Sequence, residues 1–227
     1  MIVNVPKSWG IQISRCQMPK QPVKQLVVPE AIEPIDVFPA TGDDIYWIAN
    51  EEKNVYGENP IDIMPYKLIN SWYRKNPTCF WIIKRLGGER LGNLYLLPLK
   101  PKALDKLING KICERDIRSE DIYSEKESDK ITSLHITSLV CPKYSEGTVQ
   151  FIRNFNQIIK NICDTNKLSY IYALSASTEG KNLLERNGFT LVSDGKERED
   201  QHPCYSIKYE DLVTRLKHRL SKKTKHR

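Results

Sequence analysis

The chain of 227 residues carries a formal net charge of +7, with 40% hydrophobic and 28% charged residues. This is the balance of a soluble globular protein, which excludes a largely disordered, collagen-like or coiled-coil chain. Its apolar runs fall short of the ~20 residues of a membrane-spanning helix, and its first residues lack the basic and apolar segments of a secretory signal, so we expect neither.

The pattern along the chain predicts an extended arm at residues 1–34, one folded domain at 35–211 and a basic tail at 212–227. The arm holds five prolines, each of which removes a backbone donor and restricts its neighbour. In the domain, alternating apolar residues between turn residues indicate strands at 35–38, 79–84, 90–98, 131–141, 168–173, 190–192 and 205–209.

Apolar residues at helical spacing predict the helices of the same domain. The first begins at Thr41 or Asp43, both good N-cap residues, and the others cover residues 66–75, 102–108, 149–163 and 178–187. Gly188 is expected to end the last of these, because glycine accepts the left-handed conformation found after a helix. The order of the elements predicts an α/β domain in which two helices cross between strands.

Three segments of this domain are similar to those of a known family: Arg90–Leu99, Leu139–Tyr144 and Leu183–Phe189. In this order and spacing, the chain resembles the GNAT superfamily of acyl-CoA-dependent N-acyltransferases. The resemblance implies a mixed, mostly antiparallel twisted sheet flanked by helices. It also implies an enzyme that moves an acetyl group from acetyl-CoA to a primary amine of a small molecule or a protein, without a metal.

The resemblance places the cofactor at the end of the strand at 131–141. Backbone groups of Leu139, Val140 and Cys141 would pair with the pantetheine arm and polarise the thioester carbonyl. The pyrophosphate would lie on the loop that follows and on the start of the next helix, whose N–H groups attract anions. The residues expected there are Ser145, Glu146, Gly147, Thr148, Val149 and Gln150. The alternative is an ordinary connection with Ser145 or Thr148 as the N-cap.

The chain departs from the family pattern at several of these positions. Ser145 replaces a glutamine or arginine, Thr148 replaces a glycine, and Glu146 adds a negative charge beside an anion site. Leu184 and Ser177 lie where many relatives carry a tyrosine and an asparagine. A catalytically weak or inactive GNAT-fold module that makes contacts in a larger assembly is therefore an alternative function.

Two side chains are candidates for proton transfer. His135 could deprotonate the amine, directly or through water, and Tyr172 or its neighbour Tyr170 could act as a general acid. The alternative for each is a residue that only packs in the fold. The acidic residues Glu114, Asp116, Glu120 and Asp121 could attract a cationic amine or could form a solvated loop.

The whole excess of positive charge lies in the tail. Residues 212–227 hold seven lysines and arginines and no acid, and the remaining 28 basic residues equal the 28 acidic ones. Leu212, Leu216 and Leu220 recur every four residues, which predicts a helix that packs one apolar stripe on the domain. The alternative is a weak contact with a polyanion through the basic side chains.

The six scattered cysteines form no C-x-x-C pair, and a chain of this length needs no disulfides. We therefore expect reduced thiols and a cytoplasmic protein. The acceptor amine is unidentified from the sequence, and a homodimer or another protein partner stays open.

Overall fold

A computed structural model describes residues 33–57, 62–141 and 145–224, with the side chains of 145–148 and 219–224 left out. The arm expected at 1–34 lies outside the described residues except for its last two. The strands are β1 (Ile35–Pro39), β2 (Phe80–Arg85), β3 (Arg90–Leu97), β4 (Ser133–Val140), β5 (Tyr170–Leu174), β6 (Thr190–Ser193) and β7 (Cys204–Lys208). The helices are α1 (Gly42–Tyr56), α2 (Tyr66–Lys75), α3 (Pro101–Ile108), α4 (Ser145–Ile162), α5 (Thr178–Arg186) and α6 (Tyr209–Thr224).

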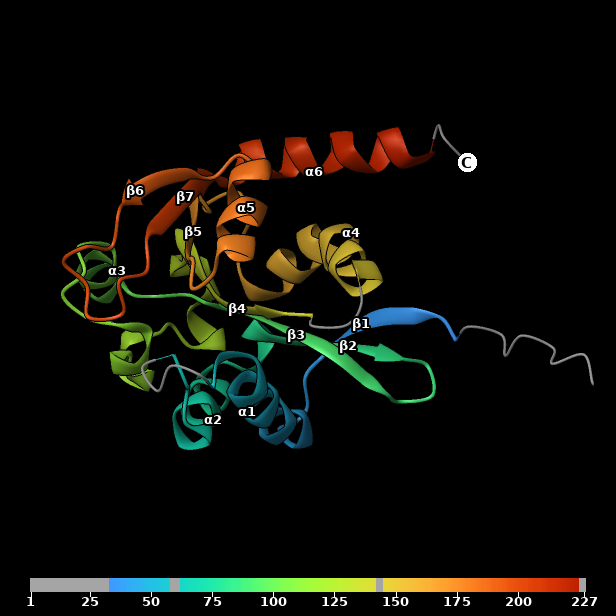
Figure 1. Cartoon of the computed structure of the whole chain (residues 1–227), viewed down its shortest axis with the longest axis horizontal. Helices are drawn as coiled ribbons and strands as arrows, with labels where there is room; N and C mark the ends of the chain where they lie inside the picture. The colour runs from blue at the N-terminus through green and yellow to red at the C-terminus, as the bar shows by residue number, and fades with distance from the viewer. Residues whose placement is uncertain (1–32, 58–61, 142–144, 225–227) are drawn as a thin grey trace, which may run out of the picture. The chain divides into compact units, whose positions relative to one another are not determined.

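In the described residues, the strands form one mixed sheet in the order β1-β2-β3-β4-β5-β7-β6. Every neighbouring pair is antiparallel except β4 and β5, which run parallel. Helices α1 and α2 cover one face, and α4, α5 and α6 lie on the other (Figure 1). The chain therefore has the twisted mixed sheet with flanking helices that the sequence predicts.

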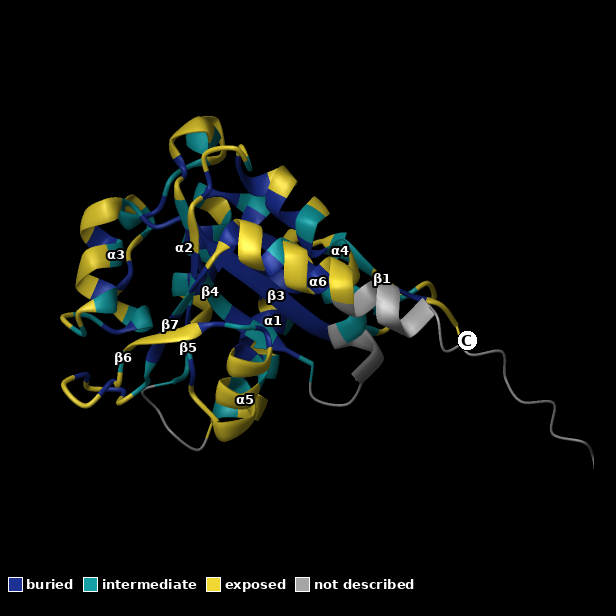
Figure 2. Ribbon diagram, turned by 90° about the horizontal axis from the view of Figure 1, so that it is seen from above, coloured by how far each residue is buried: buried dark blue, intermediate teal, exposed yellow. Residues whose placement is uncertain are grey.

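The core lies where β3 and β4 pass between the two helical layers. Seven successive residues of β3, from Leu91 to Leu97, are buried, and Figure 2 shows these central strands enclosed while the outer faces of the helices are exposed. A strand that is covered on both faces reads as a continuous apolar run rather than an alternating one. The sequence Leu94–Leu97 shows such a run.

An ion-pair cluster fixes the start of α1 to the β2–β3 hairpin. The carboxylate of Asp44 is fully buried and accepts hydrogen bonds of 2.8 Å from the backbone N–H and the hydroxyl of Thr41, the N-cap residue. Lys84 of β2 and Arg90 of β3 reach the same carboxylate at 2.9 and 2.7 Å. One side chain thus helps to cap the helix and forms ion pairs with two cations of the hairpin.

The helix α4 begins one turn earlier than the sequence predicts. Residues 145–148, expected as a loop before the helix at 149–163, form its first turn, so the prediction of a loop there is wrong. Serine, threonine and glycine have low helix propensity, which makes this stretch look like a loop. They are tolerated at the start of a helix because the first N–H groups have no partner within it.

The tail expected at 212–227 continues the domain as α6, which contacts α4 and β7. Leu212 and Leu216 are buried in the main hydrophobic core, while Lys217 is exposed. The side chain of Leu220, the third leucine of the predicted stripe, lies outside the described residues. The two described leucines pack as the stripe predicts, so α6 is a structural part of the fold.

We expect Asp44→Asn to lower the free energy of unfolding at pH 7 by roughly 2 kcal/mol. Burial acts to raise the pKa of Asp44, but the hydrogen bonds from Thr41, Arg90 and Lys84 lower it to about 2. The ionised carboxylate therefore stabilises the fold above about pH 4, and this contribution is lost as the pH falls towards 2. Urea denaturation at pH 7, 4 and 2.5 measures the difference, with the exposed Asp36→Asn as the control. A difference that does not shrink at low pH would contradict the assignment.

Candidate active site

The parallel strands β4 and β5 part in the middle of the sheet. Their pairing runs from Ser133–Tyr170 to Ile136–Ala173 and then stops, while β4 continues to Val140 along β3. Beyond Ile136, no residue of β5 pairs with β4 in the described chain. The backbone of β4 therefore presents an edge to a gap inside the sheet, where an extended ligand could add as a strand.

A bulge in β4 marks the same place. Tyr95 of β3 pairs with Ser138, but the next residue, Leu96, pairs with Ile136, so Thr137 is the extra residue. Bulges turn side chains away from the regular alternation of a strand. As a result, Thr137 and Ser138 both line a cavity of about 140 Å³ beside the gap.

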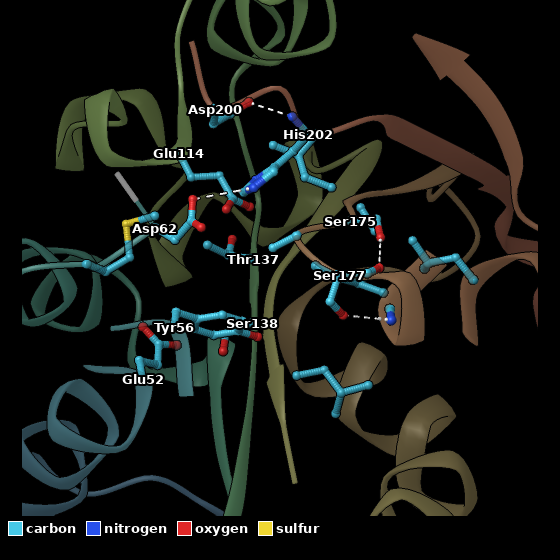
Figure 3. A pocket seen from close by; sticks show the side chains of 18 of the residues that line it. Glu52, Tyr56, Asp62, Glu114, Thr137, Ser138, Ser175, Ser177, Asp200 and His202 are labelled. Carbon is cyan, nitrogen blue, oxygen red and sulfur yellow. Dashed lines mark hydrogen bonds and ion pairs between the residues drawn. The ribbon is translucent and has the colours of Figure 1, made fainter. Parts of the chain in front are cut away.

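This cavity, which we call the acidic cavity, is enclosed by segments far apart in the sequence. Its walls are β4, the end of β5, the start of α5, the second half of α1, the 3-10 turn Glu114–Asp116 and the segment 200–202. Four carboxylates line it: Glu52, Asp62, Glu114 and Asp200. Figure 3 shows Glu52 beside Tyr56 and Ser138 at one end and Asp200 with His202 at the other.

Glu52 is the most deeply buried of these carboxylates, with 1% of its surface exposed. Its Oε2 accepts a hydrogen bond of 3.1 Å from the Tyr95 hydroxyl, and its Oε1 has no hydrogen-bond partner among the described residues. Within those residues no cation forms an ion pair with it. A buried carboxylate without a cation is costly and is typical of a functional site.

Burial raises the pKa of Glu52 to about 7, since water no longer stabilises the charged form. The nearby Ser138 hydroxyl and the hydrogen bond from Tyr95 oppose this rise, and the negative charge of Glu114 adds to it. A carboxylate with a pKa near 7 can both take up and release a proton at neutral pH, which is the requirement for a general base.

The other three carboxylates have partners of different kinds. Arg198 binds Asp200 through two hydrogen bonds of 2.8 Å, which neutralises it. Glu114 lies 2.5 Å from Nε2 of His135. Asp62 lies 3.4 Å from Nε2 of His202. Histidine carries a positive charge only when it is protonated. Among the described residues, no lysine or arginine lines it.

A second, apolar cavity of about 70 Å³ lies on the side of the sheet that α4 and α6 cover. It is lined by Phe151 and Phe155 of α4 and by Leu212 and Leu216 of α6, together with residues of β3, β4 and α5. The two cavities share four residues of β4 and α5: Ile136, Leu139, Leu183 and Leu184. They therefore adjoin each other at the place where β4 and β5 part.

The two predicted proton-transfer residues lie near the acidic cavity but do not line it. His135 is fully buried on β4, where its Nε2 contacts Glu114 and its Nδ1 has no partner among the described residues. Tyr172 pairs with His135 in the register of β5 and packs against the ring of Tyr170. Burial raises the pKa of Tyr172. His135 is thus positioned to orient Glu114. Tyr172 packs against Tyr170, as the alternative of a packing residue expects.

The predicted cofactor residues fall on both sides of the gap. Leu139 lines both cavities, Val140 is buried, and Cys141 directs its thiol towards the carbonyl of Leu91 at 3.8 Å. Val149 and Gln150 are half-buried on α4. The side chains of Ser145, Glu146, Gly147 and Thr148 lie outside the described residues. The predicted set is therefore divided between the end of β4 and the first turns of α4.

Two positions that depart from the family pattern also line the acidic cavity. Leu184 contributes an apolar side chain to its wall. Ser177 is the N-cap of α5, and its hydroxyl accepts a hydrogen bond of 3.0 Å from the N–H of Gly180. Its neighbour Ser175 donates 2.8 Å to the Ser177 carbonyl. The hydroxyl of Ser177 therefore caps α5.

The sequence analysis misses Glu52, although the sequence contains a signal for it. Ile45, Ile48 and Ala49 define the apolar stripe of the first helix, and Glu52 is the next position on that stripe. A carboxylate on a face that must be buried is either paired or functional. Asp62 and the remaining cavity wall carry no comparable signal, because distant loops bring them together.

No family model matches the chain, and no curated protein is similar to it. Solved structures are similar in fold. A GNAT-family acetyltransferase from Staphylococcus aureus Mu50 superposes with a TM-score of 0.50 and 10% identity, over 77% of this chain and 99% of that one. The loading GNATL domain of CurA from Lyngbya majuscula gives a TM-score of 0.55 at 12% identity, over 78% and 99%.

A third solved structure is FeeM, an N-acyl amino acid synthase from uncultured soil microbes. It has a TM-score of 0.54 at 8% identity and covers 81% of this chain and 95% of that one. The chain therefore has the GNAT fold, as a divergent example of it.

In the part that the structure describes, no helix combines the length and apolarity needed to span a bilayer.

We expect Glu52→Gln to have a higher free energy of unfolding than the wild type at pH 8, and this advantage to shrink as the pH falls to 4. Folding raises the pKa of Glu52 from 4.5 to about 7, so the folded state holds a proton that the unfolded state releases between these values. The stability of the wild type therefore falls as the pH rises through this range, by about 3 kcal/mol in full, whereas the glutamine variant escapes this loss. Urea denaturation between pH 4 and 8 measures the gap, with Glu51→Gln on the same helix as the control. A gap independent of pH would show that Glu52 is solvated.

Proposed function

We propose that the protein is an N-acyltransferase that moves an acetyl group from acetyl-CoA to a primary amine, with Glu52 as the general base. The observation that carries the proposal is the position of Glu52. Its unpartnered oxygen, with a pKa near 7, lies beside Ser138, one residue from the Leu139 backbone that would polarise the thioester. A base at this place can take the proton of an attacking amine.

The gap between β4 and β5 suits the cofactor. The pantetheine arm would pair with the backbone edge of β4 beyond Ile136. It would pass the four residues that the two cavities share and reach the first turn of α4, whose N–H groups suit the pyrophosphate. The apolar cavity accepts carbon chains, and the acidic cavity accepts a cation, so the two substrates would meet between Leu139 and Leu184.

In the reaction, the amine enters the acidic cavity as a cation and gives one proton to Glu52. Its nitrogen then forms a bond to the acyl carbon, and the carbon–sulfur bond breaks. The nitrogen passes its second proton to water, and the thiolate sulfur takes up one proton from water, directly or through the Ser177 hydroxyl, which regains its proton from water. Glu52 then returns its proton to solvent. The balance is one amide, one free CoA thiol and one proton released to solvent.

The fold neighbours support acyl transfer as the class of reaction. One is a GNAT-family acetyltransferase and another is an N-acyl amino acid synthase. The departures at Leu184 and Ser177 favour the alternative, a GNAT-fold module without activity that makes contacts in an assembly. Glu52 argues against this alternative, since a binding module has no use for a buried and unpaired carboxylate in the gap.

Acetyl-CoA is expected to raise the melting temperature of the purified protein. A ligand that binds only the folded state at about 100 times its Kd adds roughly 2.7 kcal/mol to the stability. Differential scanning fluorimetry with acetyl-CoA measures the shift, and adenosine 5′-monophosphate at the same concentration serves as the control. If millimolar acetyl-CoA gives no shift, the cofactor assignment fails and the alternative module is favoured.

Replacing Glu52 by glutamine should slow acyl transfer about 10²–10⁴-fold, which is the usual contribution of a general base. The wild-type kcat/KM should rise as the pH increases through about 7, because only the ionised carboxylate accepts a proton. The variant should lose this rise. Release of the CoA thiol from acetyl-CoA, with a panel of primary amines, reports the rate, and Glu51→Gln is the matched control. Equal rates for the two variants would remove Glu52 from the mechanism.

A further inference from the structure

We propose that the apolar cavity holds the alkyl chain of the donor's acyl group, and that the protein prefers a butanoyl group to an acetyl group. This inference rests on the proposed N-acyltransferase function and names the size class of the transferred group. The chain takes no part in the reaction itself, in which the amide bond forms and the carbon–sulfur bond breaks as with an acetyl group.

The first support is the chemistry of the cavity wall. The described residues that line it are all apolar except Asn187. The side-chain amide of Asn187 donates a hydrogen bond of 2.7 Å to the carbonyl of Leu183. A polar or charged ligand would lose its contacts with water in such a space, whereas a hydrocarbon chain gains free energy by leaving water. The cavity therefore suits an alkyl group.

The second support is the place where the cavity meets the gap between β4 and β5. In the described chain, Ile136 is the last residue of β4 that pairs with β5, and Ile136 and Leu139 line both cavities. In the proposed reaction, the thioester carbonyl lies at the Leu139 backbone, on the boundary of the two cavities. An alkyl chain that entered the acidic cavity would meet the buried carboxylate of Glu52, which it cannot solvate. The chain therefore belongs in the apolar cavity, which leaves the acidic cavity to the amine.

The third support is that the cavity interrupts a close-packed core. Phe151 and Phe155 of α4 and Leu212 and Leu216 of α6 line it, and each belongs to the main hydrophobic core with at most 8% of its surface exposed. Protein interiors are close-packed, and an empty space among core residues costs stability. A space kept beside the reacting centre is explained by a group that fills it when the donor binds.

The size of the cavity sets the length of the chain. A cavity of about 150 Å³ in a protein binds benzene, which has six carbon atoms, and the apolar cavity measures about 70 Å³. It therefore has room for about three carbon atoms, which together with the carbonyl carbon make an acyl group of about four carbons. An acetyl group would leave most of the space empty, and an octanoyl group would overfill it.

The test compares acetyl-CoA, butanoyl-CoA and octanoyl-CoA as donors to the same primary amine, with release of the CoA thiol as the readout. We expect the full-length protein to give a kcat/KM at least about tenfold higher for butanoyl-CoA than for acetyl-CoA, since each buried methylene group contributes about fourfold. Octanoyl-CoA should be the poorer donor than butanoyl-CoA, because its chain is too long for the cavity.

Two substitutions of Leu216, in the outer wall of the cavity, test where the chain binds. Leu216→Phe fills part of the space and should lower the ratio of the butanoyl to the acetyl kcat/KM about tenfold. Leu216→Ala enlarges the space and should move the preference towards hexanoyl-CoA. Leu104→Phe and Leu104→Ala are the matched controls and should leave the ratio unchanged, because Leu104 is a partly buried leucine of α3 that lines neither cavity. Thermal melting verifies that each variant is folded.

Equal kcat/KM values for acetyl-CoA and butanoyl-CoA, or an equal loss with both donors in Leu216→Phe, would overturn the inference and leave the acyltransferase standing. The second result would assign the cavity to the pantetheine arm. A thermal-shift titration with each thioester, without an amine, decides the case in which no CoA is released. A larger shift with butanoyl-CoA than with acetyl-CoA, reduced in Leu216→Phe, would support the inference. Equal shifts would overturn it, and no shift with either thioester would overturn both proposals.

Discussion

The buried carboxylate of Asp44 is the constraint on which the site depends. It caps α1 and receives Lys84 from β2 and Arg90 from β3, so the helix is held at one end to the central hairpin. The other end of the same helix carries Glu52 and Tyr56 into the acidic cavity. An α-helix rises 1.5 Å per residue and is stiff, so fixing its first turn to the hairpin sets where Glu52 meets β4.

A second constraint acts on β4 itself. The strand pairs with β3 along its whole length, but with β5 only up to Ile136. The bulge at Thr137 falls next to this point, so Thr137 and Ser138 both line the cavity while Leu139 reaches both cavities. Gly92, next to the Asn93–Val140 pair, allows β3 and β4 to approach closely at that end, because a Cβ atom there would overlap the carbonyl oxygen of Val140. Backbone geometry, more than side-chain identity, opens the gap.

The sequence predicts the elements well because each carries its own local signal. Thr41 as N-cap, Gly188 after α5 with a φ of +87°, and the apolar periods of the helices are all read from a few neighbouring residues. The start of α4 is predicted too late, since Ser145, Gly147 and Thr148 resemble a loop. Apart from the place of Glu52 on the apolar stripe of α1, the acidic cavity has no local signal, because Glu52, Glu114 and Asp200 meet only after the sheet has formed. Burial, which the residue type alone does not reveal, raises the pKa of Glu52 to about 7.

In the described residues, helix α6 lines the apolar cavity but not the acidic cavity. The apolar cavity owes its outer wall to Leu212 and Leu216, in a segment that follows the last strand. The acidic cavity owes its wall to α1, the insert before β4 and the segment at 200–202. Each wall can vary without the other, because their shared boundary is limited to four residues of β4 and α5. The two cavities are therefore free to change shape independently of each other on this one sheet.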